Sequence, residues 1–322
     1  MKNGIVVVGD VFVDIKGFPY EKYILAGRNA GDVKIVHGGV GRNIAEDIAN
    51  MELRPTFVST VDLSAQGEDV IKKLQRHKVN TEFIAPVENG MGMWLAVFDE
   101  TGDVVASISK RPDMEPLARI VETRGEEIFS ECDAVVVEID LGKEIIKSVL
   151  RFAHKYGKKV YAAVANISIA SERRDLIKET DCFVCNLAEA ESFFFESFGD
   201  LSPEELSVKL LRKVQEAGLA QMVVTLGNSG CVYANANGDN GYSPALPIRP
   251  VDTTGAGDGF CAGLAAGLTY GCPLSKAVEI GTRIAASVIA GTENVCPRFL
   301  PEELGIDISG GTSDFYGSEI KK

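Results

Sequence analysis

The chain has 322 residues, 45% of them apolar, and a formal net charge of −13. This composition supports one or two domains with a sizeable core, whereas the acidic balance excludes an extended nucleic-acid surface, which needs clustered Lys and Arg. No apolar run approaches the roughly 18 residues of a membrane-spanning helix. The short run IVVV near the N-terminus predicts a first strand and no signal peptide. We expect a cytoplasmic protein with reduced thiols, because its seven Cys are scattered along the chain.

Short apolar runs alternate with helical patterns along the chain. Strands are predicted at 4–9, 56–60, 134–139, 159–165, 182–185 and 221–226. Helical periodicity is found between them, near 41–52, 66–77, 143–156, 187–198 and 203–217. Almost uninterrupted apolar strands are typical of parallel strands that are buried on both faces. The pattern therefore predicts an α/β fold with an open, mostly parallel sheet and helices on both faces.

Residues 91–109 interrupt this alternation, because they resemble two strands joined by the turn DETGD without an intervening helix. Segments 11–17 and 33–37 also have extended patterns. We predict that the three segments form a small sheet outside the main body. Such a sheet is a lid, a surface for a homodimer or an ordinary edge hairpin. Residues 301–322 are Gly- and Ser-rich toward their end, which predicts a mobile tail after a domain of residues 1–300.

One cysteine pair, Cys182 and Cys185, has the spacing of a metal or redox motif. Both residues lie in a predicted strand, where positions three apart point to opposite faces. No second pair accompanies them. We therefore predict two core thiols.

The segment DTTGAGDGFCAG, residues 252–263, joins an extended run to an apolar helical pattern. The first turn of a helix presents unpaired N–H groups and a positive dipole end. Gly255, Ala256 and Gly257 let a ligand approach this backbone closely, which predicts an anion hole for a phosphoryl group in transfer. Asp258 is placed to accept the proton of an attacking hydroxyl. The alternative is that the small residues permit close helix packing and Asp258 is only an acid at a helix start.

A second glycine cluster, HGGVGRNIAED at 37–47, leads into a predicted amphipathic helix. Asn43 lies at the start of this helix, and its amide offers donors and an acceptor to a polyol. Asp10 and Asp14 are four residues apart in an extended segment, so both carboxylates can face the same side and accept hydrogen bonds from sugar hydroxyls. Asp10 could equally cap a turn. Neither the G-x-x-x-x-G-K-[ST] loop nor, after the first strand, the G-x-G-x-x-G loop is present.

Five segments carry a family resemblance: GDVFVD at 9–14, GGVGRN at 38–43, NLAE at 186–189, TLGNSG at 225–230 and DTTGAGDGFCAG at 252–263. In this order and spacing they resemble the ribokinase-like carbohydrate kinase family over about residues 4 to 300. The resemblance implies a ribokinase-like fold and an ATP-dependent kinase that phosphorylates a primary hydroxyl of a sugar or nucleoside.

The resemblance also implies roles for the matching residues. On the reacting side, it implies a catalytic base at Asp258, an anion hole at Gly255, Ala256 and Gly257, sugar contacts at Asp14, Gly39 and Asn43, and a further sugar-side acid at Glu138. On the nucleotide side, it implies Mg²⁺ and phosphate positioning through water by Asn186 and Glu189, a nucleotide-binding turn at Thr225, Gly227 and Gly230, and a monovalent cation such as K⁺ at Asp252 and Thr254.

Some of these residues have a simpler interpretation. Glu189 could be a solvated helix residue, and Glu138 could be an acid at a sheet end without a ligand. Two turns also depart from the family pattern, because Asp62 and Glu52 stand where many members have Gly. These departures affect loops near the substrate and leave the phosphoryl-transfer residues unchanged.

The substrate is predicted from a few residues. GGVGRN looks more like the pseudouridine kinases of the family, since ribokinase-type members have Lys in place of Val40. An apolar residue there suits a base attached to the sugar, which favours pseudouridine. A free sugar (ribose, fructose or ketogluconate) or another nucleoside is the alternative. A non-catalytic sugar-binding homologue is disfavoured, because Asp258 and the anion hole are intact.

Overall fold

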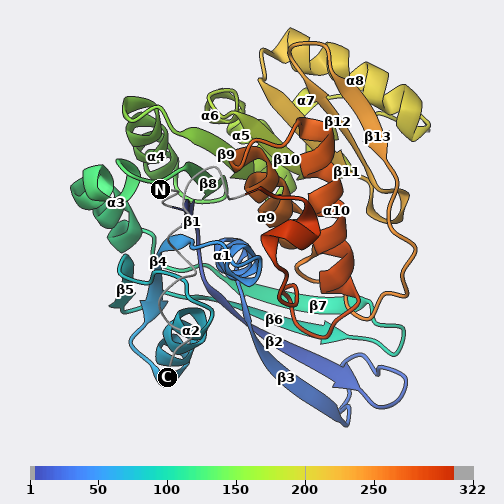
Figure 1. Cartoon of the computed structure of the whole chain (residues 1–322). Coiled ribbons are helices and arrows are strands. Elements are labelled where there is room, and N and C mark those ends of the chain that lie inside the picture. Colours follow the sequence, from blue (N-terminus) through green and yellow to red (C-terminus); the bar gives the residue numbers. More distant parts are fainter. Residues whose placement is uncertain (1–3, 200, 308–322) are drawn as a thin grey trace, which may run out of the picture.

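The computed structural model describes residues 4–199 and 201–307, and its main layer is a nine-stranded sheet with the order β13-β12-β11-β10-β9-β8-β1-β4-β5 (Figure 1). Parallel pairing joins β1 (Ile5–Val8), β4 (Thr56–Asp62), β5 (Ile84–Val87), β8 (Ala134–Glu138), β9 (Lys159–Ala163), β10 (Cys182–Asn186) and β11 (Gln221–Thr225). Antiparallel strands β12 (Cys231–Asn235) and β13 (Asn240–Ser243) complete one edge. Each predicted strand is confirmed, whereas the edge strands β5 and β13 and the neighbouring β12 lack the long apolar signal of buried strands and were not predicted.

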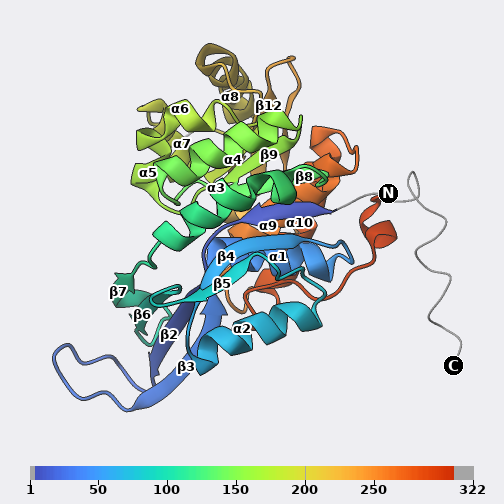
Figure 2. The same ribbon diagram turned by 90° about the vertical axis from the view of Figure 1, so that its left-hand side faces the viewer.

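Helices cover both faces of the main sheet, as predicted (Figure 2). One face packs against α1 (Val40–Asn50), α2 (Ala65–Arg76), α9 (Ala256–Thr269) and α10 (Leu274–Ile289). The other face packs against α3 (Glu115–Phe129), α4 (Lys143–Lys155), α5 (Ile167–Glu172), α6 (Arg174–Ile177), α7 (Leu187–Phe194) and α8 (Pro203–Ala217). Alternate residues of β1 enter the two cores, with Val7 in the first and Val8 in the second. Within residues 4–199 and 201–307, no helix is long and apolar enough to cross a membrane.

Six of the seven cysteines are buried, and Cys272 is partly buried against the first core. Cys182 belongs to the first core and Cys185 to the second, which confirms that the two thiols face opposite sides of β10. All seven Cys are free. The described part of the chain contains no cluster of three or more His, Cys, Asp or Glu that could hold a metal ion.

A separate four-stranded sheet has the order β3-β2-β6-β7 and projects from the main body (Figures 1 and 2). It consists of β2 (Phe12–Pro19), β3 (Gly31–Gly38), β6 (Gly92–Phe98) and β7 (Val104–Lys110). This confirms the predicted small sheet, and we call it the lid sheet. Because side chains alternate along a strand, one face carries Asp14 and Lys16 and the other carries Ile15.

The predicted tail begins too early. Residues 301–307 are ordered, with a short 3-10 helix η2 (Pro301–Leu304) and the side chains of Leu304 and Ile306 buried in the first core. Their apolar residues precede the Gly- and Ser-rich stretch, and this explains why the composition of the whole segment misled the prediction. The remainder of the predicted tail, 308–322, lies outside the described residues.

The two departures from the family pattern have structural consequences. Glu52 adopts a left-handed backbone with φ 57°, which explains why Gly is common there. Its carboxylate forms ion pairs with Lys78 at 3.3 Å and Arg298 at 2.5 Å. The Oδ1 atom of Asp62 accepts a hydrogen bond from the backbone amide of Met91 at 3.0 Å, just before β6. Asp62 therefore ties β4 of the main sheet to the start of a lid strand.

Candidate active site

The site is built where the carboxyl ends of β1 and β8 meet the start of α1. The Oε2 atom of Glu138, at the end of β8, accepts hydrogen bonds from the backbone amides of Asp10 at 3.1 Å and Gly41 at 3.3 Å. Gly39 precedes α1 with φ 98°, a conformation that favours glycine. Glu138 is only 3% exposed, and its hydrogen bonds to two backbone amides give it a structural role at the end of the sheet. Its role as a sugar-side acid stays a prediction.

Asn43 and Asp258 connect the first turns of α1 and α9. The Nδ2 atom of Asn43 donates a hydrogen bond to Oδ2 of Asp258 at 2.7 Å, although the two residues are 215 positions apart. The Oδ1 atom of Asn43 is buried and has no hydrogen-bond partner among the described residues. A buried acceptor without a donor is unfavourable. Asn43 thus holds Asp258 in place and leaves an acceptor for a hydroxyl of a ligand.

Asp14 approaches the same point from the lid sheet. It is 7% exposed, and a Cβ atom on Gly38 would lie 2.5 Å from its Oδ2 atom. The glycine before Gly39 therefore makes room for this carboxylate. Asn43 contacts Asp258 directly, and the charge of Asp14 acts on the ionisation of Asp258. Sugar contacts at Asp14, Gly39 and Asn43 stay a prediction.

Burial changes the acidity of this cluster. Burial raises the pKa of Asp258 to about 7, although hydrogen bonding from Asn43 and the charge of Arg42 lower it. Burial also raises the pKa of Asp10 to about 7, against a lowering hydrogen bond with Glu138, and it raises the pKa of Glu138 well above its usual value. A base with a pKa near 7 accepts a proton efficiently at neutral pH.

The predicted anion hole is the first turn of α9, and its two glycines differ. Gly255 has φ 83°, and a Cβ atom there would lie 2.1 Å from the carbonyl oxygen of Asn294. Close packing therefore explains Gly255. Apart from its chain neighbours and the backbone of its own helix, no atom of the described residues lies within 4 Å of the position that a Cβ atom would take at Gly257. Packing cannot explain this second glycine, whereas an approaching anion would need the open space beside it.

Asn186 and Glu189 form a capping box at the start of α7. The backbone amide of Asn186 donates to Oε2 of Glu189 at 2.7 Å, and the backbone amide of Glu189 donates to Oδ1 of Asn186 at 2.9 Å. Glu189 is 3% exposed, so its interpretation as a solvated helix residue is wrong. Burial raises the pKa of Glu189 to about 7. A single buried carboxylate fits Mg²⁺, which proteins commonly hold by one or two carboxylates, waters and substrate phosphates.

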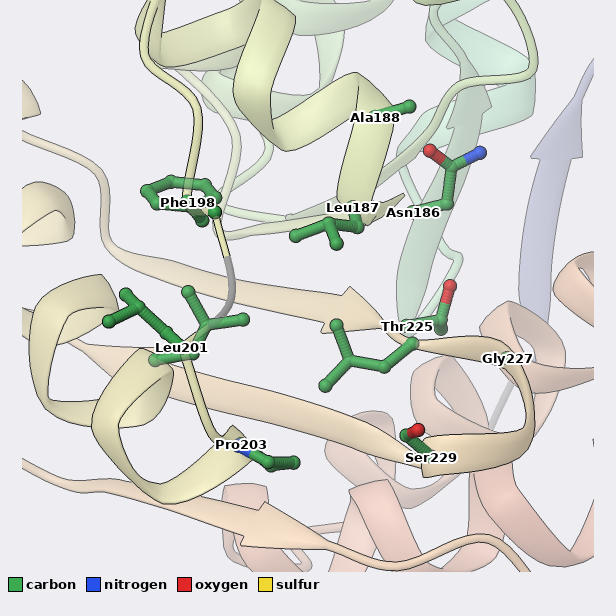
Figure 3. A pocket seen from close by; sticks show the side chains of 12 residues that line it. Asn186, Leu187, Ala188, Phe198, Leu201, Pro203, Thr225, Gly227 and Ser229 are labelled. Carbon is green, nitrogen blue, oxygen red and sulfur yellow. The ribbon is translucent and has the colours of Figure 1, made fainter.

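Three of the predicted nucleotide-side residues, Asn186, Thr225 and Gly227, line one pocket of about 460 Å³, whereas Glu189 and Gly230 are not among its lining residues. Asn186, Thr225, Gly227 and Ser229 line one part of it, beside the apolar side chains of Leu187, Phe198, Leu201 and Pro203 (Figure 3). Gly227 and Gly230 both have positive φ in the turn after β11, 59° and 88°. The turn therefore depends on glycine, and the pocket joins polar backbone groups to an apolar wall.

The predicted cation ligands Asp252 and Thr254 already have a cationic partner. The Nζ atom of Lys16, on β2, lies 3.4 Å from Oδ2 of Asp252 and 3.2 Å from Oγ1 of Thr254. The Lys16 side chain is 4% exposed. A second cation bound to these oxygens would be repelled by the ammonium group. These side-chain oxygens therefore do not fit K⁺ while Lys16 contacts them.

Sequence reasoning missed three aromatic residues on the inner face of the lid sheet, the face that carries Asp14. Trp94 of β6 is the register partner of Asp14. Its ring meets the ring of Phe98 edge-on at 6.4 Å, and Phe98 stacks on Phe18 at 4.7 Å. The signal was present, because Trp94 is the single Trp of the chain and lies in a segment predicted to be part of the lid.

Comparison with known proteins shows what the chain is similar to. Residues 2–295 match the pfkB family carbohydrate kinase model. A guanosine-inosine kinase from Exiguobacterium acetylicum is 32% identical over 296 residues, which are 91% of this chain and 96% of that protein. The pseudouridine kinase of Escherichia coli (strain K12) is 25% identical over 280 residues, which are 86% of this chain and 88% of that protein.

Solved structures share the fold. The ribokinase of Arabidopsis thaliana, complexed with ribose and ATP, has a TM-score of 0.78 at 20% identity and covers 94% of this chain and 99% of its own. A carbohydrate kinase from Agrobacterium tumefaciens has a TM-score of 0.76 at 22% identity, over 95% of this chain and 98% of its own. These similarities confirm the ribokinase-like fold that the motifs implied.

We predict that Asp258→Asn keeps the fold and lowers kcat by about 10³-fold, since a general base contributes roughly 10²–10⁴. In the parent enzyme, kcat/KM should rise with pH through about 7, because the raised pKa keeps Asp258 protonated below it. The measurement is a pH–rate profile with a melting curve at each pH. Because the folded-state pKa of Asp258 lies above its unfolded value, the free energy of unfolding falls as the pH rises toward 7. A rate that rises with pH therefore cannot be explained by a more stable protein. A variant retaining a tenth of the parent kcat would contradict the role.

We predict that Gly257→Ala keeps or slightly raises the free energy of unfolding, since Ala replaces Gly in an open helical position. Turnover should fall at least about tenfold, because the added methyl group enters the space of the anion. Gly142→Ala is the matched control, since Gly142 also lies at a helix start with no protein contact below 3.9 Å. Equal turnover in the two variants would show that Gly257 has no role in binding an anion.

Proposed function

The chain belongs to the pfkB family of carbohydrate kinases and is an ATP-dependent sugar or nucleoside kinase, and within that class we propose that it phosphorylates the 5′-hydroxyl of a nucleoside. The observation that carries this proposal is the aromatic surface beside Asp14. Trp94 is half-buried and shares the inner face of the lid sheet with Asp14, its register partner. A free sugar has hydroxyls for Asp14 but no flat surface for the ring, whereas a nucleoside offers both.

The same geometry gives each residue a task in the proposed reaction. Asp14 and the free acceptor of Asn43 would bind ribose hydroxyls and aim the primary hydroxyl at Asp258. Asp258 would remove its proton, and the first backbone amides of α9 would stabilise the phosphoryl oxygens. Bound Mg²⁺ would supply positive charge to the phosphates, with Glu189 and Asn186 as the residues that hold it. The lid sheet would exclude water, which otherwise competes as an acceptor.

A purine nucleoside, guanosine or inosine, is our first candidate, because the relative at 32% identity is a guanosine-inosine kinase. Pseudouridine is the second candidate, supported by the segment GGVGRN and by the relative at 25% identity. The argument from Val40 is weaker in the structure, since Val40 is the first residue of α1 and packs against the first core. Core packing alone accounts for an apolar residue there. A cytoplasmic location, where ATP is available, is part of the proposal.

We predict that kcat/KM for a nucleoside exceeds that for ribose, fructose or ketogluconate by at least about tenfold. Trp94→Ala should lower kcat/KM for the preferred nucleoside by about 5- to 100-fold, because base stacking on an aromatic ring contributes roughly 1–3 kcal/mol. Its effect on ribose should be below threefold. Coupled assays at saturating ATP with guanosine, inosine, pseudouridine, uridine and the free sugars make the measurement.

Trp94→Phe is the matched variant, because it keeps an aromatic face and should retain most of the activity. A parent enzyme that prefers a free sugar would overturn the nucleoside proposal and leave the kinase assignment intact. Equal losses on nucleoside and ribose in Trp94→Ala would show that the ring supports the lid and does not contact the base.

We also propose that a second copy of this chain covers the outer face of the lid sheet. The strand registers align Ile35, Ile15, Leu95 and Ile108 in one row across this face. Ile35 is 58% exposed, Leu95 40% and Ile108 70%. Ile15, between Ile35 and Leu95, is only partly buried. A row of aliphatic side chains across four strands, three of them exposed, is more typical of an interface than of a solvated sheet. A homodimer through the lid would bury it.

We predict that the protein is a dimer in solution and that the double substitution Ile35→Asp, Ile108→Asp makes it a monomer. Two buried carboxylates facing an apolar partner would disfavour the interface strongly. Light scattering after size exclusion gives the mass. Val208→Asp is the control, since Val208 is 50% exposed on α8, far along the chain from the lid strands. A monomeric parent protein, or a dimeric double variant, would contradict the proposal.

A further inference from the structure

Lys16 is a buried cation whose partners belong to another part of the chain. It lies in β2, and its ammonium contacts Asp252 and Thr254, 236 and 238 residues away. These two residues precede Gly255, the N-cap residue of the anion-hole helix α9. Burying an ammonium group is unfavourable unless it is paired and hydrogen-bonded. The contact is therefore a specific feature of the site and not a chance surface pair.

The oxygen atoms around the Lys16 ammonium resemble the ligand atoms of a cation site. Asp252 contributes one carboxylate oxygen and Thr254 a hydroxyl oxygen to the ammonium. The other oxygen of Asp252, Oδ1, accepts the backbone amide of Thr254 at 2.8 Å, which closes the loop on itself. Hydrogen bonds to Asp252 from Thr254 and the charge of Lys16 lower the pKa of this carboxyl, although its burial opposes them. Asp252 is thus held ionised opposite a cation.

We propose that the ammonium group of Lys16 serves as a built-in monovalent cation, so that this kinase orders its anion-hole loop without binding K⁺ there. The group is covalently attached, and it needs no ion from solution to neutralise Asp252. It also links two parts of the fold, since Lys16 lies on the lid sheet and Asp252 lies in the main body. The lid and the loop before the anion hole are thereby held together by one charge-assisted contact.

The position of Lys16 within β2 explains how the device is built. Lys16 is two residues after Asp14, so both side chains lie on the inner face of the lid sheet. Asp14 points to the substrate side, where it lies beside Gly38, and Lys16 points to the loop of Asp252. The charge of Lys16 also lowers the pKa of Asp14, against the raising effect of burial. Loss of Lys16 would then affect both the loop and the substrate carboxylate.

The test compares cation dependence in the parent enzyme and in Lys16→Ala. Turnover and melting temperature are measured in buffers with K⁺, Na⁺, ammonium or tetramethylammonium at equal ionic strength. We expect the parent enzyme to vary less than twofold in turnover among these cations. Lys16→Ala should lose at least about tenfold in tetramethylammonium and regain activity in K⁺ or ammonium. K⁺ should also raise the melting temperature of Lys16→Ala and leave that of the parent unchanged.

Two further variants complete the design. Lys16→Met keeps the length of the side chain and removes its charge, so it replaces Lys16→Ala if that variant does not fold. Lys34→Met is the matched control, because Lys34 is the register partner of Lys16 on β3 but is exposed and contacts the Phe18 ring. It should remain independent of the cation.

Several results would overturn the proposal. Activation of the parent enzyme by K⁺ above about fivefold would show that a solvent cation is still required. A Lys16 variant with unchanged turnover in every cation would show that the ammonium has no such role. A Lys16 variant that is inactive in all cations and whose melting temperature does not respond to K⁺ would reduce Lys16 to a packing residue. The melting measurement needs no substrate, so it is independent of whether the preferred acceptor is a nucleoside.

Discussion

The hydrogen bonds of one buried carboxylate fix the junction on which the site depends. Glu138 ends β8 and accepts the backbone amides of Asp10, after β1, and of Gly41, in the first turn of α1. Gly9 and Gly41 approach so closely that a Cβ on Gly9 would lie 2.5 Å from the Cα of Gly41. This contact sets the direction of α1, and α1 in turn carries Asn43 to Asp258. The position of Asp258, the proposed general base on α9, therefore depends on an acid at the end of β8.

The site contains four neighbouring acids and few basic groups that could balance their charge. Asp10, Asp14, Glu138 and Asp258 lie close enough to affect one another's ionisation, and burial disfavours the charged form of each. Arg42 forms a buried ion pair with Glu46 at 3.0 Å and still favours ionised Asp258 and Asp14. Partly protonated acids are both acceptors and donors for hydroxyl groups. Burial makes the ionised cluster unfavourable in the absence of a ligand. The same burial suits the cluster to hydrogen bonding with a polyol and to proton transfer.

Alternate residues of the lid strands face opposite sides of the sheet, so its two faces carry different kinds of side chain. The inner face of β2 and β6 carries an acid, a lysine and aromatic rings, whereas the outer face carries exposed aliphatic residues. In the proposed enzyme, the inner face would contact substrate and the loop of Asp252, and the outer face would contact a second molecule. A shift of one residue in register would exchange these faces. The parallel pairing of β2 with β6 is consequently as important to the site as any catalytic group.

Local sequence determined the parts of this protein that depend on neighbouring residues. Apolar runs predicted each buried parallel strand, and the glycine-rich segments predicted where helices α1 and α9 begin. Short edge strands such as β5 and β13 were missed, because their partners and not their own residues stabilise them. Only the tertiary structure decided what meets across long separations. It brought Lys16 to Asp252, it assigned one oxygen of Glu138 to backbone amides, and it placed Trp94 beside Asp14. Such pairings depend on strand order and register, and no local pattern in the chain encodes the distance between residues so far apart.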